Sequence, residues 1–305
     1  MRGDDNTDSS ARTGTPLIVI FNPTAGNRRV HRLWQVLDIL SASGVRVELR
    51  ETAYAGHATA LARQAVSEGA CQVVAAGGDG TIAEVAAGLA GSKTALGVIP
   101  LGTANVLALE LRLPFTPRAI AAALAFGRTR TLWPGVATYA GGTRLFVQMV
   151  GVGLDAQVVH AMPRRLKRLM GRGAYVAMTL REMARYSYQK LSVRIDDVVL
   201  QAESVVISKG SLYAGHYLLA PDARPGERGF EVALFGAGGP GAALMYGAAL
   251  TLNLLPRAPG MRLIRGREVE VLTDNHVKAQ ADGDPAGEAP LLVRDAAAPL
   301  EVGTG

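Results

Sequence analysis

The stretch of sequence that decides the fold is Cys71-Gln72-Val73-Val74-Ala75-Ala76-Gly77-Gly78-Asp79-Gly80-Thr81-Ile82-Ala83-Glu84-Val85. An apolar run of strand length leads into a turn with three glycines, and a helical pattern begins directly after it. Glycine lets the backbone turn sharply and approach a ligand closely, while the unpaired N–H groups and the dipole at the start of a helix favour an anion. Residues 77–81, called the glycine turn below, are therefore predicted to bind a phosphate group.

Asp79 is the acidic side chain inside the glycine turn. A carboxylate alone would repel a bound polyphosphate, so the chemistry predicts that Asp79 either works beside a bridging Mg²⁺ ion or accepts a proton. The alternative is a plain strand-to-helix turn in which Asp79 only caps the helix.

Outward from this stretch, the first half of the chain alternates strand-like and helical patterns. Strands are predicted at residues 17–21, 45–49, 72–76 and 96–99, and helices at residues 30–40, 58–66 and 82–89. Such alternation is typical of a doubly wound parallel sheet covered by helices. We expect an α/β domain over residues 16–130, preceded by a disordered, solvated tail at residues 1–15.

Polar loops follow the other predicted strands, at residues 22–27, 52–57 and 100–105. In an open parallel sheet the loops after successive strands meet at the carboxyl edge, where ligands bind. Thr103 and Asn105 offer short polar side chains for a phosphate or a ribose, although both are also ordinary residues at the start of a helix. The four loops together predict one ligand site on this edge.

The second half of the chain has a different pattern, in which strand candidates follow one another directly. They lie at residues 146–150, 191–195, 198–207, 229–235 and 268–272. This arrangement predicts a C-terminal β-rich, sandwich-like domain over residues 131–305. Residues 280–285 place Asp282 and Asp284 around a glycine, which the sequence alone interprets as a hairpin turn.

Length and composition favour a folded chain with a sizeable core and two domains. The 305 residues are 49% hydrophobic, and the single cysteine, Cys71, is expected to be buried in a strand; without a disulfide framework, a cytoplasmic location is favoured. The longest apolar stretch, residues 242–255, is shorter than the ~20 residues of a membrane-spanning helix. No membrane span is therefore expected.

Positive charge is unevenly distributed along the chain. The formal net charge of +6 is concentrated in residues 164–172, without the interleaved aromatic residues of a single-strand nucleic-acid groove, so no nucleic-acid partner is expected. With the apolar residues 174–178 and 180 that follow, this segment is predicted to lie on an anionic membrane. A solvated basic helix end is the alternative.

Three other patterns do not predict function. Residues 91–94 resemble the end of a Walker A loop, but Ser92 separates the glycine from the lysine and a helix precedes it. Residues 151–156 satisfy a dinucleotide-binding pattern, but the acidic residue expected about twenty positions later is missing. The histidines lack metal-ligand spacing.

Taken together, these motifs resemble the diacylglycerol kinase catalytic-domain family, which includes bacterial lipid kinases and sphingosine kinases and is distantly related to NAD kinases. The resemblance runs in order through residues 22–26, Thr52 with residues 56–58, residues 77–81 with Glu84, and residues 100–105, 151–156, 220–221 and 282–284. It implies ATP as phosphate donor, a diacylglycerol-type or sphingoid-type lipid hydroxyl as acceptor, and a site between the two domains. With the basic segment at residues 164–172, it favours a cytoplasmic enzyme that lies peripherally at the inner face of an anionic membrane.

The resemblance further implies roles for individual residues. The predicted ATP contacts are Asn22, Pro23, Thr24, Gly26, Thr52, Gly77, Gly78, Asp79, Gly80, Thr81, Glu84, Gly102, Thr103 and Asn105. Asp79 would hold Mg²⁺. Asp284 would accept the proton of the lipid hydroxyl, with Asp282 as the alternative.

This sequence departs from the family pattern at two places. Asp284 stands where the family has Glu, and Arg228 stands where many bacterial relatives have an aspartate that binds a structural Mg²⁺, so that accessory site is expected to be absent. The departures leave open a second hypothesis, a catalytically weak nucleotide-binding or regulatory homologue. A third is NAD kinase-like activity, which would use the same phosphate motif.

Overall fold

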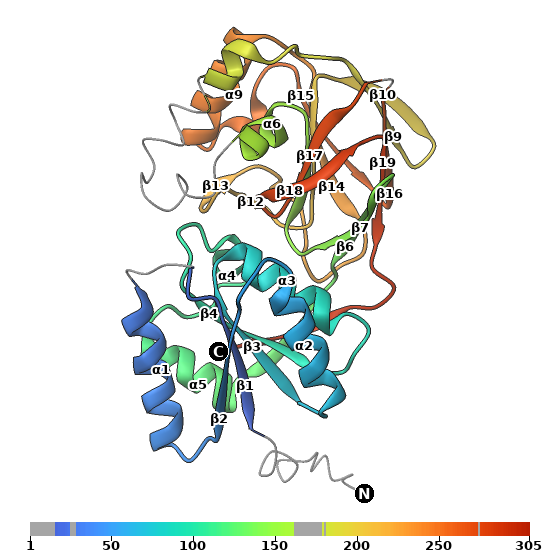
Figure 1. Ribbon diagram of the computed structural model, residues 1–305. Coiled ribbons are helices and arrows are strands. Elements are labelled where there is room, and N and C mark those ends of the chain that lie inside the picture. Colours follow the sequence, from blue (N-terminus) through green and yellow to red (C-terminus); the bar gives the residue numbers. More distant parts are fainter. Residues whose placement is uncertain (1–15, 25–28, 162–178, 180, 274) are drawn as a thin grey trace, which may run out of the picture.

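A computed structural model describes residues 16–24, 29–161, 179, 181–273 and 275–305. The predicted tail, Gly26, and the predicted membrane segment at residues 164–172, 174–178 and 180 lie outside the described residues. The chain forms an α/β domain and a β-rich domain, stacked in Figure 1 with the α/β domain below. Both parts of the predicted fold are confirmed.

The α/β domain is built on a sheet with strand order β2-β1-β3-β4-β20-β5. Its strands are β1 (Leu17–Phe21), β2 (Val47–Glu51), β3 (Gln72–Gly77), β4 (Ala95–Pro100), β5 (Arg128–Leu132) and β20 (Leu300–Thr304); its helices are α1 (Val30–Ala42), α2 (His57–Ser67), α3 (Asp79–Leu89), α4 (Val106–Glu110) and α5 (Pro117–Phe126). The first four strands pair in parallel. β3 is buried along almost its whole length, because apolar clusters cover both faces of the sheet.

Two features of this domain differ from the sequence prediction. Cys71 is exposed and precedes β3, so its predicted burial is wrong: the apolar run that suggested burial begins after it, at Val73. The last strand, β20, lies in this sheet, parallel to β4 and antiparallel to β5, although the sequence groups residues 131–305 in the second domain. A five-residue strand carries no local signal for its partner, because pairing is a long-range contact.

The β-rich domain contains two antiparallel sheets. One has the order β10-β9-β16-β19-β6-β7 and the other β15-β14-β11-β8-β17-β18, with a small β12-β13 pair beside them. The strands are β6 (Gly135–Tyr139), β7 (Gly142–Phe146), β8 (Met149–Val152), β9 (Leu191–Ile195), β10 (Val198–Ala202), β11 (Ser204–Ser208), β12 (Leu212–Tyr213), β13 (Tyr217–Leu218), β14 (Phe230–Phe235), β15 (Met261–Gly266), β16 (Glu268–Leu272), β17 (Val277–Ala281), β18 (Asp284–Ala289) and β19 (Leu291–Asp295); the helices are α6 (Leu154–Ala161), α9 (Pro240–Thr251) and η3 (Leu255–Arg257). Side chains from both sheets form one core, as a sandwich requires.

Two strand predictions in this domain are corrected by the structure. The single strand expected at residues 198–207 is two strands, β10 and β11, which lie in different sheets because the chain changes sheet at Glu203. The strand expected at residues 146–150 is divided as well: Phe146 ends β7, and Met149 begins β8. A continuous β-rich pattern does not show where a strand passes from one sheet to the other.

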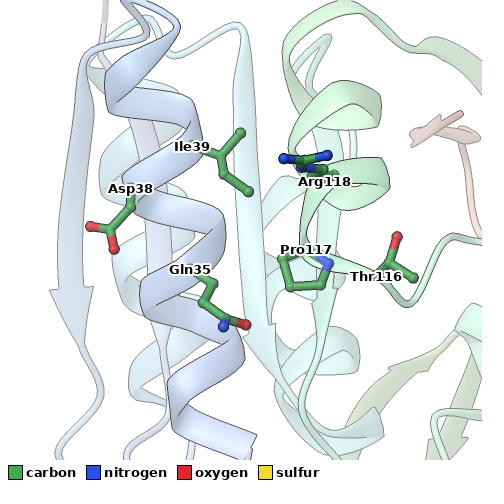
Figure 2. Close-up of a pocket in the computed structure, with 6 residues that line it drawn as sticks. All are labelled: Gln35, Asp38, Ile39, Thr116, Pro117 and Arg118. Atoms are coloured by element: carbon green, nitrogen blue, oxygen red, sulfur yellow. The ribbon is translucent and has the colours of Figure 1, made fainter.

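None of the helices in the described ranges combines the length and apolar character needed to cross a bilayer. A broad depression of about 530 Å³ lies between α1 and α5, lined by Gln35, Asp38, Ile39, Thr116, Pro117 and Arg118 (Figure 2). None of the predicted site residues lines it, so it is not the candidate site.

Candidate active site

The glycine turn joins β3 to α3 and contacts the loop at residues 101–105. The amides of Leu101 and Gly102 donate to the carbonyl of Gly77, at 2.9 and 3.2 Å. A Cβ atom at Gly102 would lie 2.6 Å from the Cα atom of Gly78, so a side chain there would push the two loops apart. The close backbone contact therefore requires a glycine at position 102, and it places two of the predicted phosphate loops together.

The loop after β1 joins the same group through side chains. Asn22 Nδ2 donates to Thr81 Oγ1 at 3.1 Å, and Asn22 Oδ1 accepts from the amide and hydroxyl of Thr24, at 3.0 and 2.8 Å. Pro23 lies between these two residues. Three of the four predicted loops thus meet at the start of α3, as the carboxyl-edge argument expected.

The loop after β2 is attached by Glu84 on α3. The carboxylate of Glu84 accepts from the amides of Gly56 and Ala58, at 2.9 and 3.2 Å, and so occupies the start of α2. The amide of Thr52 donates to the carbonyl of Phe21 at 2.9 Å, which fixes the beginning of this loop. Glu84 therefore ties the fourth loop to α3, and its predicted contact with ATP stays a prediction.

Asp79 caps a helix, but not its own. Its Oδ1 accepts from the amide of Val106 at 2.7 Å, at the start of α4, whereas α3 has no side-chain cap. Burial raises the pKa of Asp79, and the amides at the start of α4 oppose this shift. Asp79 thus fastens the glycine turn to the loop that contains Thr103 and Asn105.

Asn105 has a backbone conformation that is unusual for a residue with a side chain. Its φ is 48°, and its side-chain Nδ2 donates to the carbonyl of Gly102 at 2.8 Å. Its Oδ1 is buried and has no hydrogen-bond partner among the described residues. Thr103, by contrast, is exposed. The loop therefore offers one buried acceptor and one exposed hydroxyl beside the glycine turn.

The two acids of the hairpin between β17 and β18 have different surroundings. The carboxylate of Asp282 accepts from the amides of Val147, Gln148 and Met149, at 2.8, 2.8 and 3.0 Å. Burial raises the pKa of Asp282 to about 6, the three amides oppose the shift, and the negative charge of Asp79 adds to it. Asp282 is thus a buried residue that fixes the hairpin to residues 147–149 inside the β-rich domain.

Asp284 faces the other domain. Its Oδ2 lies so close to Gly80 that a Cβ atom built on Gly80 would be 2.6 Å away, and it is 3.7 Å from Nη2 of Arg144. Its side chain is 41% exposed. The structure therefore brings a carboxylate of the β-rich domain against the glycine turn of the α/β domain.

Sequence reasoning missed three residues around this junction, which are Arg144 on β7, Glu110 on α4 and Asp155 on α6. Glu110, at the end of α4, accepts from Ser211 Oγ at 3.0 Å and from the amide of Leu212 at 2.9 Å, and so joins the two domains. Neither Arg144 nor Glu110 belongs to a recognisable local motif.

Asp155 lies beneath the hairpin. It accepts from the Tyr213 hydroxyl and from Gln280 Nε2, the latter at 2.8 Å, while Gln280 Oε1 accepts from the amide of Gly283 at 2.8 Å. Burial raises the pKa of Asp155, and these two hydrogen bonds oppose the shift. The motif at residues 151–156 could have indicated this acid, but not its partners.

No group of three or more His, Cys, Asp or Glu side chains suited to a metal ion is found among the residues that the structure describes. Mg²⁺ commonly retains several waters and takes only one or two carboxylates together with substrate phosphates. Asp79, Asp284 and the unpartnered Oδ1 of Asn105 supply oxygen atoms around the glycine turn. This donor set suits a Mg²⁺ ion that arrives with a nucleotide, and it does not form a preformed metal cage.

Two family models match the chain. The model described as "Diacylglycerol kinase catalytic domain" matches residues 16–136, and the model described as "YegS C-terminal NAD kinase beta sandwich-like domain" matches residues 148–303, about half of the chain. The chain belongs to the diacylglycerol kinase family. It is a lipid kinase, a phosphotransferase with an alcohol group as acceptor.

Individual relatives of this lipid kinase agree with the family models. A diacylglycerol kinase from Staphylococcus saprophyticus is 29% identical over 211 residues, which cover 68% of either chain. A protein from Cronobacter sakazakii named "Probable lipid kinase YegS-like" is 28% identical over 265 residues, 82% of this chain and 83% of its own. A crystal structure from Bacillus anthracis has the same fold, with a TM-score of 0.77 at 18% identity, and covers 98% of each chain.

Proposed function

We propose that this lipid kinase transfers the γ-phosphate of ATP to the hydroxyl group of a diacylglycerol-type or sphingoid-type lipid, in the junction between the glycine turn and Asp284. The observation that carries the proposal is the position of the Asp284 carboxylate against Gly80. A carboxylate from one domain meets a phosphate-binding turn of the other, which is the arrangement that phosphoryl transfer to an alcohol needs.

The α/β domain would hold ATP. Backbone amides of the glycine turn and the start of α3 are suited to the phosphates, and Asn22, Pro23, Thr24, Gly26, Thr52, Thr81, Gly102, Thr103 and Asn105 are the remaining proposed contacts. Asp79 keeps two of these loops in register by holding the amide of Val106. Mg²⁺ bound with ATP would be held near Asp79 and would neutralise charge on the phosphates.

Asp284 is the proposed base, and Asp282 is its support. Both oxygens of Asp282 already accept backbone amides, so this carboxylate cannot turn toward a substrate without breaking those hydrogen bonds. Asp284 is partly exposed and faces the glycine turn, so it can take the proton of the lipid hydroxyl at an Oδ atom. Arg144 lies beside it and can stabilise negative charge near the transferred phosphate.

We place this reaction in the cytoplasm, at the surface of an anionic membrane. The support is that the acceptor of a lipid kinase resides in a bilayer. The basic segment at residues 164–172 remains a predicted bilayer contact.

The test is phosphate transfer from γ-labelled ATP to a total lipid extract, with identification of the labelled lipid. The wild-type protein should label one lipid class, and Asp79→Asn should abolish the label while circular dichroism stays unchanged. ATP binding without transfer to any lipid would favour the regulatory alternative. Transfer to NAD instead of lipid, in a parallel reaction, would favour NAD kinase-like activity.

A further inference from the structure

The longest apolar run of the chain lies on its surface. Helix α9 and the residues that follow it, from 240 to 254, contain no charged side chain, and Tyr246 is the buried residue of the helix. Leu244, Leu252 and Leu254 are 59%, 68% and 49% exposed. A helix that is apolar all round is normally buried, and large apolar side chains gathered on a surface mark an interaction site.

The chain between β14 and β16 carries only positive charge, although Glu203 from the turn between β10 and β11 packs against Gly238, just before α9. Residues 232–267 contain no Asp or Glu, but they contain Arg257, Arg262, Arg265 and Arg267. Arg265 is paired with Glu227, whereas Arg257 is exposed at the end of η3, directly after the apolar run. An apolar helix followed by cations matches the interface of an anionic bilayer, where apolar side chains enter the acyl region and arginines meet the headgroups.

We propose that α9 together with Leu252, Leu254 and Arg257 is the surface by which this kinase docks on an anionic membrane. The proposal rests on the proposed function, because it places the enzyme beside a bilayer that contains its acceptor. A helix of twelve residues is too short to span a bilayer, so it lies in the plane of the interface. The absence of acidic residues over residues 232–267 suits a negatively charged partner, and the charge-free apolar helix beside it suits the acyl region of an anionic bilayer.

The docking surface is physically connected to the junction between the domains. Asn253 Oδ1 accepts from the amide of Leu218 on β13, at 2.8 Å, and β13 pairs with β12. On β12, the amide of Leu212 donates to Glu110 of α4, the helix whose first amide is held by Asp79. Figure 1 shows α9 on the same side of the β-rich domain as β12 and β13. Docking through α9 would therefore bring the acceptor layer to this side of the molecule.

The experiment is co-sedimentation of the full chain with vesicles of phosphatidylcholine, with and without phosphatidylglycerol. Wild-type protein should bind the anionic vesicles, and the double variant Leu244→Glu/Leu252→Glu should lose at least tenfold in affinity. The matched control is Val198→Glu/Val199→Glu, which places two acidic residues on exposed positions of β10, 58% and 55% exposed. The control should bind like the wild type.

Equal binding by the Leu244→Glu/Leu252→Glu variant and the wild type would overturn the proposal, and so would an equal loss in both double variants. If the Leu244→Glu/Leu252→Glu variant lost a dimer in analytical ultracentrifugation but kept vesicle binding, α9 would be a contact between two copies of the chain, and the proposal would be wrong. Transfer to a water-soluble short-chain acceptor should be unchanged in the α9 variant. Absence of transfer by the wild type to any acceptor would refute the proposed function, while the vesicle result would still decide the role of α9.

Discussion

The two halves of the candidate site are made in different ways. The glycine turn is formed by neighbours in sequence, and its proposed binding groups are backbone amides at the start of α3. The hairpin that carries Asp282 and Asp284 is held by hydrogen bonds to the amides of residues 147–149. These residues precede Asp282 by 133 to 135 positions in the sequence. The difference indicates that the first half depends on its glycines and on the short side chains of Asp79 and Thr81, whereas the second half depends on contacts between distant parts of the chain.

The same contrast exists inside the hairpin. Asp282 has a left-handed backbone, φ 50°, and a carboxylate fixed by three amides, while Asp284 is partly exposed and faces the glycine turn. One acid shapes the hairpin, and the other is the proposed base at its surface. Substitutions at these two positions should therefore have effects of different kinds.

Within the hairpin, the largest effect is expected for Asp284→Asn, because an amide cannot accept the proton of the acceptor hydroxyl. A general base contributes about 10²- to 10⁴-fold, so kcat should fall by about 10³-fold while KM for ATP stays near the wild-type value. Steady-state kinetics with a lipid acceptor measures both. The matched variant Asp284→Glu keeps the carboxylate and should therefore keep most of the wild-type activity. An Asp284→Asn enzyme with the wild-type kcat would show that Asp284 takes no part in the chemistry.

Asp282→Asn should change stability and its dependence on pH. The folded pKa of Asp282 is about 6, above the ordinary 3.8, so the folded protein binds this proton more tightly than the unfolded chain does. The contribution of Asp282 to stability is therefore fully present below about pH 4 and is lost as the pH rises to about 6, by roughly 3 kcal/mol in total. In Asp282→Asn this loss should disappear.

Urea unfolding of the wild type and of Asp282→Asn at pH 4 and pH 7 tests this prediction. Because pH 4 already lies just above the unfolded pKa, this interval contains about 2 kcal/mol of the total loss. On going from pH 4 to pH 7, the free energy of unfolding of the wild type should therefore fall by about 2 kcal/mol more than that of the variant. The same pH dependence in both proteins would mean that Asp282 does not titrate in this range. A selective loss of kcat with unchanged stability would instead exchange the roles of Asp282 and Asp284.

Gly102→Ala tests the backbone half of the site. The added Cβ atom would lie 2.6 Å from the Cα atom of Gly78, and the strain of such a contact is about 1–3 kcal/mol, so ATP should bind about tenfold more weakly. Isothermal titration with ATP measures the change. Gly247→Ala is the control, because the Cβ atom added to this helical glycine would meet no atom of the surrounding structure within 4 Å. This variant should leave ATP affinity unchanged. Equal affinities for Gly102→Ala and the wild type would show that the two loops can separate without affecting the nucleotide.

The fold and the glycine turn could be predicted because their signals are local. An apolar strand, a glycine turn and a helical pattern occur within fifteen residues, and β3 and α3 form there as expected. The partners of the hairpin acids, of Glu110 and of Asp155 could not be predicted, because each contact joins distant parts of the chain. Likewise, the sequence predicts that Asp79 works beside Mg²⁺ or accepts a proton, with a cap on its own helix as the alternative. Its hydrogen bond to Val106 could not be predicted, because that bond depends on how two loops pack.

The smallest effect is expected at the link between the two halves. Glu110→Gln keeps one acceptor oxygen for Ser211 and Leu212 but removes the charge. The contact that holds the two domains in their relative orientation should therefore be weakened by about 0.5–1 kcal/mol. Because the proposed ATP contacts lie within one domain and the proposed transfer needs both, kcat should fall about threefold while KM for ATP stays constant. Glu110→Ala should lower kcat further in the same way. A higher KM for ATP at constant kcat would mean that Glu110 acts through α4 on the nucleotide loops, and the two halves would then be coupled in binding as well as in transfer.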